Sequence, residues 1–594
     1  MTSLTVPTQH HGAHLLATEH TRFSLWAPDA KRVSVVLKTG QRLPMCPEAN
    51  GWFVCEAPAP KGTRYRYRIN DELDVPDPAS RAQDGGIDGF SVVIDPNDYP
   101  WQHPHWKGRP WHEAVIYELH VGVLGGYAQV AKQLPRLAEL GITAIELMPL
   151  AQYSGERNWG YDGALLYAPH DTYGSPQALK QLIDTAHGLG LMVIIDVVYN
   201  HFGPQGNCLP SYASAFFEEE RHTPWGAGID HGRPEVGDFF IDNALMWLLE
   251  YRADGLRLDA VHAIDNRGFL QTLATRVKQH TAPDRHVWLT VENEFNQAQL
   301  LTNDFDAQWN DDGHNVLHAL LTGEKEAYYA DFAENSSEKL ARCLSQGFIF
   351  QGQTDRRGNA RGEPSDYLPA SAFVLFLQNH DQIGNRALGE RLHQLCPAPA
   401  LHAATALLLL SPMIPLLFMG EESAAPEPFL YFTDYTGELA TAVCEGRRKE
   451  FAEFTTFASN HPAEVTPDPN RRSTFDRSRP SLTPAHDDAA RLNTLALYQH
   501  LLDLRHQWII PRLQGAYSLG AQVLSAGAVA ARWQMADERV LHIAVNLSDR
   551  PAPYTAPAHS ELLFQSEPQL AFYLQNNHEL KPYSALVSLE RAHG

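Results

Sequence analysis

The chain shows two different rhythms of hydrophobic and polar positions. Between Arg22 and about Asp95, apolar and polar residues alternate in short runs that are separated by Pro, Gly and Asn. This alternation is typical of half-buried β-strands, because successive side chains of a strand point to opposite faces of the sheet. The same pattern returns from about Gly515, in stretches such as VAARWQM and VLHIAVNL. The sequence therefore predicts a small β-sandwich near the N-terminus and a second all-β unit at the C-terminus.

From Trp111 to Gly420 the rhythm changes to continuous apolar runs that alternate with amphipathic stretches. Continuous apolar runs indicate strands that are covered on both faces, as in parallel sheets. The strand candidates are Ala114–His120, Ile142–Met148, Leu191–Ile195, Gly255–Val261, His286–Glu292, Ala372–Gln378 and Ile414–Met419. About eight βα units fit this span, which favours an α/β fold of the (β/α)8 TIM-barrel type with inserted loops over an open doubly wound sheet. No GxGxxG follows the first strand, which also argues against a dinucleotide-binding sheet.

Capping residues mark the ends of one helix most clearly. Ser175 is a candidate N-cap, Pro176 suits the first turn, and Gly188 and Gly190 are expected to end the helix. Other helices are predicted up to Leu140, over Phe239–Tyr251, near Leu401–Leu410 and over about Ala489–Arg505. The Pro-, Arg-, Ser- and Asp-rich residues from about Phe454 to His486 predict a long irregular connection.

Length and composition set the domain count and the class of partner. The 594 residues, with 44% apolar and 20% charged residues, fit a globular chain rather than a disordered one. We expect an N-terminal β-sandwich over 1–100, a barrel with inserted loops over 101–510 and a C-terminal β domain over 511–594. Forty-seven Lys and Arg against 70 Asp and Glu give a net charge of −23, which argues against a nucleic acid or an anionic membrane as partner.

The cellular compartment is predicted from what the sequence lacks. The N-terminal stretch MTSLTVPTQHHGAHLLATEH has no basic region followed by an apolar one, and no run of about 18 apolar residues occurs anywhere. The six cysteines are scattered without CxxC spacing, which suits reduced thiols. We therefore expect a cytoplasmic protein. A pairing of Cys46 with Cys55 across a hairpin stays open, because spacing alone is weak evidence.

Candidate chemistry lies where the apolar runs end in polar residues, because catalytic residues of a barrel sit at the carboxyl ends of its strands. Four such segments are Asp196–His201, Gly255–His262, Val291–Glu294 and Gln378–Asp381. Taken singly, Asp259 could simply pair with Arg257, and Asp196 could satisfy loop amides. Three carboxylates at three separate strand ends would, however, converge on one pocket. Cleavage of a glycosidic bond needs such a set, with one carboxylate as nucleophile or base and another as proton donor.

The segments DVVYNH, GLRLDAVH, the strand ending in Glu292 and FLQNHD, in that order, closely resemble the four signature regions of the α-amylase superfamily of glycoside hydrolases. Longer strings are more particular, among them VPDPASR, RNWGYDG, AQWNDDGHN, LLTGEKEAYYADF, FLQNHDQIGNRALGERL and FMGEESAAPEPFLYFTDY. Within the superfamily these strings are similar to the maltooligosyltrehalose trehalohydrolases. The resemblance extends over nearly the whole chain. It implies that the barrel over 101–510 is catalytic and that the sandwich over 1–100 is like a carbohydrate-binding module.

The resemblance implies a role for each of three carboxylates. Asp259 matches the nucleophile, Glu292 the general acid and base, and Asp381 the third carboxylate, which holds sugar hydroxyls and favours ring distortion. The implied mechanism is retaining, with the two reacting carboxyl groups roughly 5 to 5.5 Å apart. Arg257 lies two residues before Asp259 on the same strand and would keep that carboxylate ionised.

The resemblance also implies residues that bind substrate and residues that order the site. The substrate-binding set is Tyr161, His201, Arg257, His262 and His380. The residues expected to order the site are Asp196, Asn200 and Asn379. Tyr161 matches an aromatic platform for the cleaved glucose, with plain packing as the alternative. Many amylases use the asparagine that Asn200 matches to hold calcium. The trehalohydrolases are not generally calcium enzymes, however, and the chain has no obvious carboxylate-rich loop. We therefore predict neither metal nor cofactor.

Two departures from the family pattern affect these assignments. The strand that holds Glu292 reads LTVENEFNQAQL, where the family more often shows a pattern like AESDLNDPR, so the loop has lost its expected Asp and Arg. Glu294 is therefore a competing candidate for the acid. His262 stands where many amylases have Lys followed by His, which leaves the contacts on the aglycone side open.

The function implied by the longer strings is hydrolysis of the α-1,4 bond next to the terminal trehalose of a maltooligosyltrehalose, with release of trehalose and a maltooligosaccharide. The implied pathway partner is the synthase that makes this substrate. A glucan-branching enzyme is the alternative, because the four signature regions serve a transferase equally well. A non-catalytic glycan-binding protein is a third hypothesis, but such a protein is expected to lack one of the three carboxylates, and all are present here.

Overall fold

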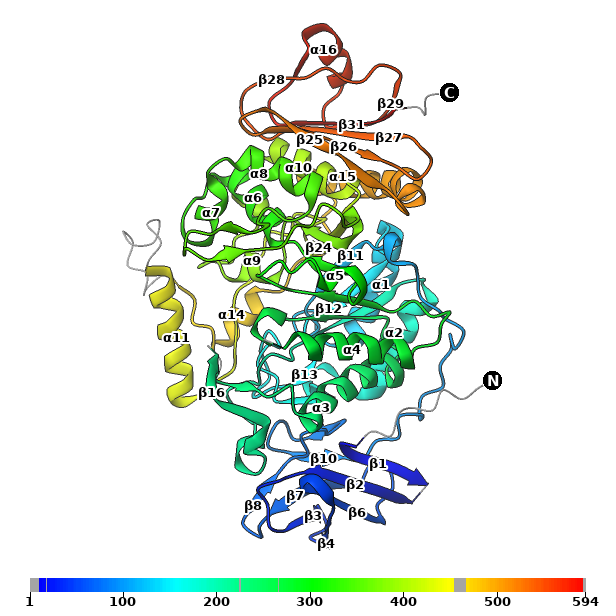
Figure 1. The fold of residues 1–594 in the computed structure, drawn as a ribbon, viewed down its shortest axis with the longest axis vertical. Coiled ribbons are helices and arrows are strands. Elements are labelled where there is room, and N and C mark those ends of the chain that lie inside the picture. The colour runs from blue at the N-terminus through cyan, green and yellow to red at the C-terminus, as the bar shows by residue number, and fades with distance from the viewer. Residues whose placement is uncertain (1–9, 18, 224–225, 265, 453–465, 591–594) are drawn as a thin grey trace.

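The computed structural model describes residues 10–590 except 18, 224–225, 265 and 453–465. Three parts are stacked along the long axis of the molecule (Figure 1). A small two-sheet unit from the N-terminal region lies at one end, a barrel with its helices occupies the middle, and a C-terminal sheet lies at the other end. The barrel and its loops hold the candidate active site.

The N-terminal unit consists of two packed antiparallel sheets. One contains, in spatial order, β1 (Gly12–Ala17), β2 (His20–Trp26), β6 (Trp52–Pro58) and β5 (Cys46–Pro47). The other contains β4 (Arg42–Pro44), β3 (Val33–Leu37), β7 (Arg64–Ile69), β10 (Phe90–Val92) and β9 (Gln83–Asp84), with β8 (Leu73–Val75) beside β7. Alternate residues face the interior, where the rings of Phe23 and Tyr65 meet edge to face with centroids 4.8 Å apart. Cys46 and Cys55 are free thiols on neighbouring strands.

The central unit is a closed parallel barrel, which confirms the predicted fold class. Its strands, in order, are β11 (Ile116–Leu119), β12 (Ala144–Leu147), β15 (Met192–Val197), β18 (Gly255–Leu258), β19 (Trp288–Val291), β20 (Ala307–Trp309), β23 (Phe373–Phe376) and β24 (Ile414–Phe418). Pairing of β24 with β11 closes the ring. Side chains such as Ile116, Ile194 and Trp309 fill its interior in layers, as is usual for barrels of this size. The sequence analysis did not predict β20.

Helices surround the barrel. The main ones are α1 (Tyr127–Leu140), α2 (Pro176–Gly188), α3 (Pro234–Leu245), α4 (Arg267–His280), α6 (Asp311–Thr322), α8 (Ser336–Gln346), α10 (Ala398–Leu410) and α15 (Ala489–Leu504). Helix α2 begins as predicted, because the Ser175 side chain accepts a hydrogen bond from the Ala178 amide. The helix expected from Phe239 instead begins at Pro234, where proline occupies the first turn, and it ends in a π-helical turn, η6 (Met246–Glu250).

The C-terminal part is a five-stranded antiparallel sheet. Its strands, in spatial order, are β25 (Tyr517–Ser525), β26 (Ala528–Gln534), β27 (Val540–Asn546), β31 (Ser584–Glu590) and β29 (Ser560–Gln565). Helix α16 (Leu570–Asn577) covers it with Leu570 and Leu574. Of the predicted irregular connection, residues 454–465 lie outside the described residues, and the rest contains helix α14 (Arg472–Arg477). Among the described helices, none is both long enough and apolar enough to cross a membrane.

Candidate active site

A pocket of about 540 Å³ opens at the carboxyl ends of the barrel strands. Of the residues that the sequence singled out, those that line it are Tyr161, His201, Asp259, His262, Glu292, the competing acid Glu294, His380 and Asp381. Four predicted residues are buried and do not line the pocket, namely Asp196, Asn200, Arg257 and Asn379. The first three contact side chains that line it, and Asn379 caps the short helix that carries His380 and Asp381. Barrel closure thus brings residues from distant parts of the chain to one cavity.

Arg257 on β18 is the centre of the site. Its guanidinium is fully buried and lies 2.8 Å from an oxygen of Asp196 and 2.8 Å from Oδ1 of Asp259 through Nη1. Through Nη2 it donates to Oε2 of Glu292 at 2.7 Å. The group also lies over the ring of Trp309, 4.2 Å from its centroid. Charge-assisted hydrogen bonds of this kind are strong and directional, so Arg257 fixes the carboxylates relative to one another.

Asp259 follows β18 and is held in its ionised form. Burial alone would raise the pKa of this carboxyl, but the Arg257 and His201 side chains and hydrogen bonds from Asn200 and Glu292 together bring the pKa below its ordinary value. The Asn200 amide donates to Oδ2 of Asp259 at 2.9 Å. A buried carboxylate that stays ionised at neutral pH has the properties that a nucleophile needs.

Glu292 follows β19 and shows the opposite behaviour. Burial has the largest effect and raises its pKa well above the ordinary value. Arg257 opposes this rise, and the negative charges of Asp259, Asp311 and Asp381 add to it. Its Oε2 accepts hydrogen bonds from Arg257 and from the Ala260 amide at 3.1 Å, which leaves Oε1 to carry the proton. The environments of the two carboxyl groups thus move their pKa values apart. The ionised Asp259 is suited to act as a nucleophile or base, and the protonated Glu292 as an acid.

The backbone of Ala260 is strained where it serves this pair. Its φ of 40° and ψ of 50° lie in the left-handed region, which is unfavourable for a residue with a Cβ atom. This conformation directs the Ala260 amide to the Glu292 carboxyl at 3.1 Å, directly after Asp259. Such strain persists only where the surrounding structure enforces it, and it is typical of functional sites.

Asp381 and His380 begin helix α9 (His380–Gly384), whose N-cap is Asn379. The Asn379 side chain accepts a hydrogen bond from the Gln382 amide at 2.9 Å, so Asn379 orders the helix rather than the pocket wall. His380 lies against Glu118 of β11, with Nδ1 2.5 Å from Oε1, and its Nε2 is 3.5 Å from Oδ1 of Asp381. Burial would lower the pKa of His380, but Glu118 and Asp381 raise it to about 9, so the ring is an imidazolium at neutral pH.

We expect Glu118→Gln to destabilise the protein in a pH-dependent way. Because the pKa of His380 is raised from 6.5 to about 9, its pairing adds stability that is fully present below pH 6.5 and is lost as the pH rises towards 9. The variant should therefore lose about 3 kcal/mol at low pH and less at high pH. Melting temperatures of parent and variant at about pH 6 and about pH 9.5 test this. A loss that is the same at both values would contradict the assignment.

Tyr161 and His201 lie side by side at the wall of the pocket. The Tyr161 hydroxyl donates to Oδ2 of Asp196 at 2.7 Å, and its ring stacks on His380 with centroids 4.9 Å apart. Burial raises the pKa of Asp196 to about 6. Protein groups contact both ring nitrogens of His201, namely Oδ1 of Asn200 and, at 2.9 Å, the carbonyl oxygen of Tyr161. In this structure His201 therefore orders its neighbours as well as lining the pocket.

His262 and Glu294 lie at the outer rim. The Glu294 amide donates to Nδ1 of His262 at 3.2 Å, and the exposed ring of Phe295 packs near this imidazole. The Glu294 side chain is 51% exposed and lies 3.8 Å from Arg357. It thus lacks the enclosure and the contact with Arg257 that Glu292 has, which favours Glu292 as the acid.

Sequence reasoning missed several carboxyl groups of the site: Asp162, Asp331 and Asp355 also line the pocket, and two others have a clear effect on it. Glu118 on β11 holds His380, and Asp311, the first residue of α6, lines the pocket. Burial, together with the negative charge of Asp381, raises the pKa of Asp311 to about 7. The signal was available, because the string AQWNDDGHN places carboxylates directly after β20. Strand β20 has only three residues and was not recognised as a strand. The carboxylates that follow it were therefore not considered as strand-end residues.

A metal does not fit the residues of the site. Within the described part of the chain, no group of three or more His, Cys, Asp or Glu side chains is placed to hold one. Asn200, the residue that binds calcium in many amylases, is already engaged, since its amide nitrogen donates to Asp259 and its oxygen contacts His201.

Comparisons with known families and structures agree with this geometry. Residues 85–225 match the model of the alpha amylase catalytic domain, residues 10–96 match carbohydrate-binding module 48 (isoamylase N-terminal domain), and residues 517–587 match a domain of unknown function (DUF3459). The chain is also similar to a crystal structure of a putative alpha amylase from Salmonella typhimurium, with 42% identity, a TM-score of 0.92, and coverage of 98% of this chain and 100% of that one.

Two curated relatives carry the same name. The chain is 41% identical to the malto-oligosyltrehalose trehalohydrolase of Deinococcus radiodurans, over 82% of this chain and 81% of the relative. It is 38% identical to the malto-oligosyltrehalose trehalohydrolase of Rhizobium sp. (strain M-11), over 95% of this chain and 97% of the relative. The similarity thus extends through the barrel and both flanking parts.

Proposed function

The chain belongs to the malto-oligosyltrehalose trehalohydrolase family of glycoside hydrolases, and we propose that it hydrolyses the α-1,4-glucosidic bond next to the terminal trehalose of a maltooligosyltrehalose. The products are trehalose and a maltooligosaccharide. The reaction class rests on one observation above all, namely that Arg257 holds two carboxyl groups whose pKa values are moved in opposite directions. The substrate rests on the relatives, which match the chain over nearly its full length.

The mechanism that these residues support is a retaining double displacement. Asp259 attacks the anomeric carbon and forms a covalent β-glucosyl ester, while Glu292 gives its proton to the departing oxygen of the trehalose unit. Glu292, now ionised, takes a proton from water as that water attacks the anomeric carbon and releases Asp259. The net change is one water consumed and one glycosidic bond broken, and both carboxyl groups return to their starting states.

The other predicted residues have supporting roles in this proposal. Asp381 and the His380 imidazolium hold hydroxyls of the cleaved glucose, and Tyr161 presents its ring to the sugar face. Arg257 keeps Asp259 ionised. Asp196 accepts hydrogen bonds from Tyr161 and Arg257, and Asn200 donates one to Asp259. His201 and His262 line the pocket. We also propose that the protein is cytoplasmic and that a maltooligosyltrehalose synthase supplies its substrate.

Product analysis tests the substrate. The purified protein is incubated with maltotriosyltrehalose and, in parallel, with maltopentaose, and the products are separated by chromatography. We expect trehalose plus maltotriose from the first and nearly no cleavage of the second, with a preference in kcat/KM of about 100-fold or more.

Two outcomes would change the proposal. Comparable cleavage of both substrates would leave the roles of Asp259 and Glu292 standing but make the enzyme a general α-1,4-glucan hydrolase. A shift in the iodine colour of amylose without new reducing sugar would instead identify a branching transferase, because a sugar hydroxyl rather than water then resolves the intermediate.

A further inference from the structure

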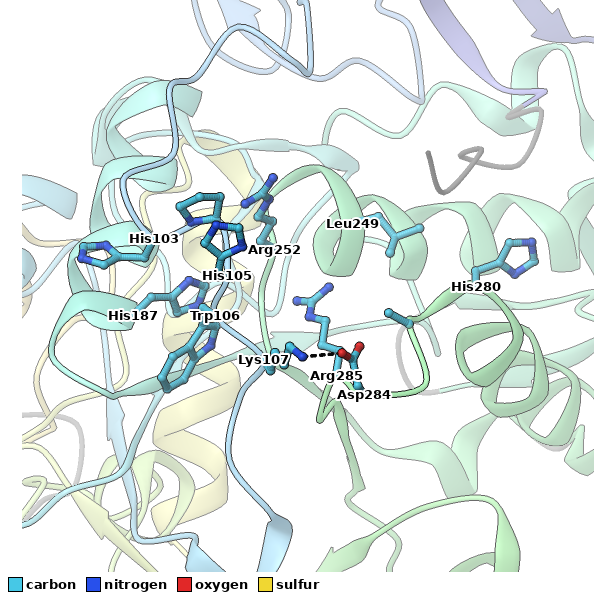
Figure 2. Close-up of a pocket in the computed structure, with 12 residues that line it drawn as sticks. His103, His105, Trp106, Lys107, His187, Leu249, Arg252, His280, Asp284 and Arg285 are labelled. Carbon is cyan, nitrogen blue, oxygen red and sulfur yellow. Dashed lines mark ion pairs between the residues drawn. The ribbon is translucent and has the colours of Figure 1, made fainter. Parts of the chain in front are cut away.

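A second cavity lies at the other end of the barrel from the candidate active site. It encloses about 360 Å³ and lies where α2, η6 and α4 end and where β15, β18 and β19 begin. One of its walls is the segment His103–Lys107, which belongs to the connection between the N-terminal sheets and the barrel (Figure 2). A ligand in this cavity would touch both the connection and the base of the barrel.

Basic side chains dominate the wall of this cavity, although the chain as a whole has a net charge of −23. The wall contains Lys107, Arg252, Arg285 and four histidines. Among the described residues that line it, Asp284 is the single carboxylate, and it pairs with Lys107 at 2.5 Å. Behind the wall, Asp184 contacts His103 and Asp254 contacts His187, and both carboxylates also accept backbone hydrogen bonds.

Helix ends explain some of these basic residues. The carboxyl end of a helix carries a partial negative charge and free carbonyl groups, which cations satisfy. Arg285 donates to the carbonyl oxygens of Leu248 at 2.7 Å and Ala253 at 2.6 Å. His280 contacts the Arg276 carbonyl oxygen at 2.8 Å. These two side chains are accounted for by the fold.

Arg252 is not explained in this way. Its guanidinium donates no hydrogen bond to any residue that the structure describes, and it lies over the Trp101 ring, 4.6 Å from the centroid. Burial and the neighbouring charge of Arg285 lower its pKa. Its backbone φ is 58°, a left-handed conformation in which glycine is preferred. This φ closes the end of η6, because the Ala253 amide donates back to the Trp247 carbonyl oxygen at 3.0 Å. The helix end therefore explains the backbone of Arg252 but not its guanidinium, whose N–H groups have no partner among the described residues.

His187 is a fixed part of the cavity wall. The residue is 5% exposed, and its Nε2 lies 2.8 Å from Oδ2 of Asp254. Its ring stacks on Trp106, with centroids 5.1 Å apart and an interplanar angle of 18°. Its Nδ1 is buried and has no hydrogen-bond partner among the described residues. The Asp254 carboxylate and the Trp106 ring thus hold this imidazole in a fixed position at the wall of the cavity, with Nδ1 enclosed by protein.

We propose that this cavity binds an organic phosphate of the size of a hexose monophosphate. The guanidinium of Arg252 has the planar fork that matches phosphate oxygens, and Arg285 beside it supplies a second positive charge, whereas Lys107 is already paired with Asp284. The indole of Trp106, which lines the cavity, offers an apolar surface to the sugar. The cavity has more room than a bare phosphate fills, which favours an ester.

Calorimetry and thermal melting on the full-length protein test the proposal, with glucose 6-phosphate, inorganic phosphate and glucose as probes. We expect saturable binding of glucose 6-phosphate that raises the melting temperature, because the ligand binds only the folded state. Arg252→Gly should weaken this binding by about tenfold or more, since a hydrogen-bonded charge is lost. Glycine adopts the local φ without strain, so this variant should fold as the parent does.

The control variant is Arg32→Ala, which removes an arginine whose side chain is 75% exposed on the N-terminal sheets. Its affinity for glucose 6-phosphate should equal that of the parent, and maltotetraose should not compete, because the cavity lies away from the active site. The absence of binding at about 10 mM would overturn the proposal. So would unchanged binding in Arg252→Gly. Equal affinity for inorganic phosphate and glucose 6-phosphate would overturn the sugar ester as ligand.

Discussion

Asp259→Asn should lower kcat/KM for maltotriosyltrehalose by about 10⁴-fold or more. The amide cannot form the glucosyl ester, and it no longer places a negative charge beside the positive charge that develops at the anomeric carbon. Asparagine keeps the shape of the side chain, and Arg257 retains Asp196 and Glu292 as partners, so the fold should persist. Steady-state kinetics with chromatographic detection of trehalose measure the loss, and the melting temperature shows whether folding is preserved.

A chemical rescue distinguishes a nucleophile from a merely structural residue. In Asp259→Gly, azide can enter the vacated space and attack the anomeric carbon from the same side as the carboxylate. The expected product is a β-configured glycosyl azide, since a single displacement inverts the α configuration. If Asp259→Asn keeps more than about one tenth of the parent activity, the nucleophile lies elsewhere.

Glu292→Gln should lower kcat/KM for the same substrate by about 10³-fold, because the departing trehalose oxygen loses its proton donor. The dependence on leaving group is the sharper test. A maltosyl fluoride needs no protonation of its leaving group, so formation of its covalent intermediate should be far less affected than that of the trehalose substrate. Pre-steady-state measurements with both substrates give the two rates.

Glu294→Gln is the matched control for this variant. Glu294 lies two residues from Glu292, lines the same pocket and was the competing acid, yet its side chain is 51% exposed and has no contact with Arg257. Its substitution should change kcat/KM by less than about tenfold. If Glu294→Gln shows the larger loss and the stronger dependence on leaving group, the roles of the two glutamates are reversed.

The fold could be predicted where a pattern is local and long. The runs around β15 and β18 are continuous and apolar, and the structure places both strands within two residues of the predicted starts. Strand β20 has three residues and was missed, because so short a run does not show a period. The start of α3 was placed too late, since the proline at Pro234 marks the first turn more strongly than the apolar residues that follow.

The residues of the site were predictable in part for the same reason. Asp259 and Glu292 follow apolar strands, and polar residues at such ends stand out in a sequence. Asp196 and Arg257 were singled out as well, but the sequence did not show that one guanidinium joins Asp196, Asp259 and Glu292. The register of β15 and β18 places Asp196 directly beside Arg257, and the neighbouring β19 carries Glu292 to the other side of the guanidinium. These three side chains come from strands that are far apart in the chain.

The sequence by itself thus determined the order of strands and helices, the α/β class and the chemical types of residue at the strand ends, because each depends on neighbours within a few positions. Only the tertiary structure decided which carboxyl is ionised and which is protonated. The pKa of Glu292 depends on burial and on Asp381, and that of His380 depends on Glu118, which lies 262 residues away in the chain. Burial and charge act through distances in space, and closure of the barrel sets those distances.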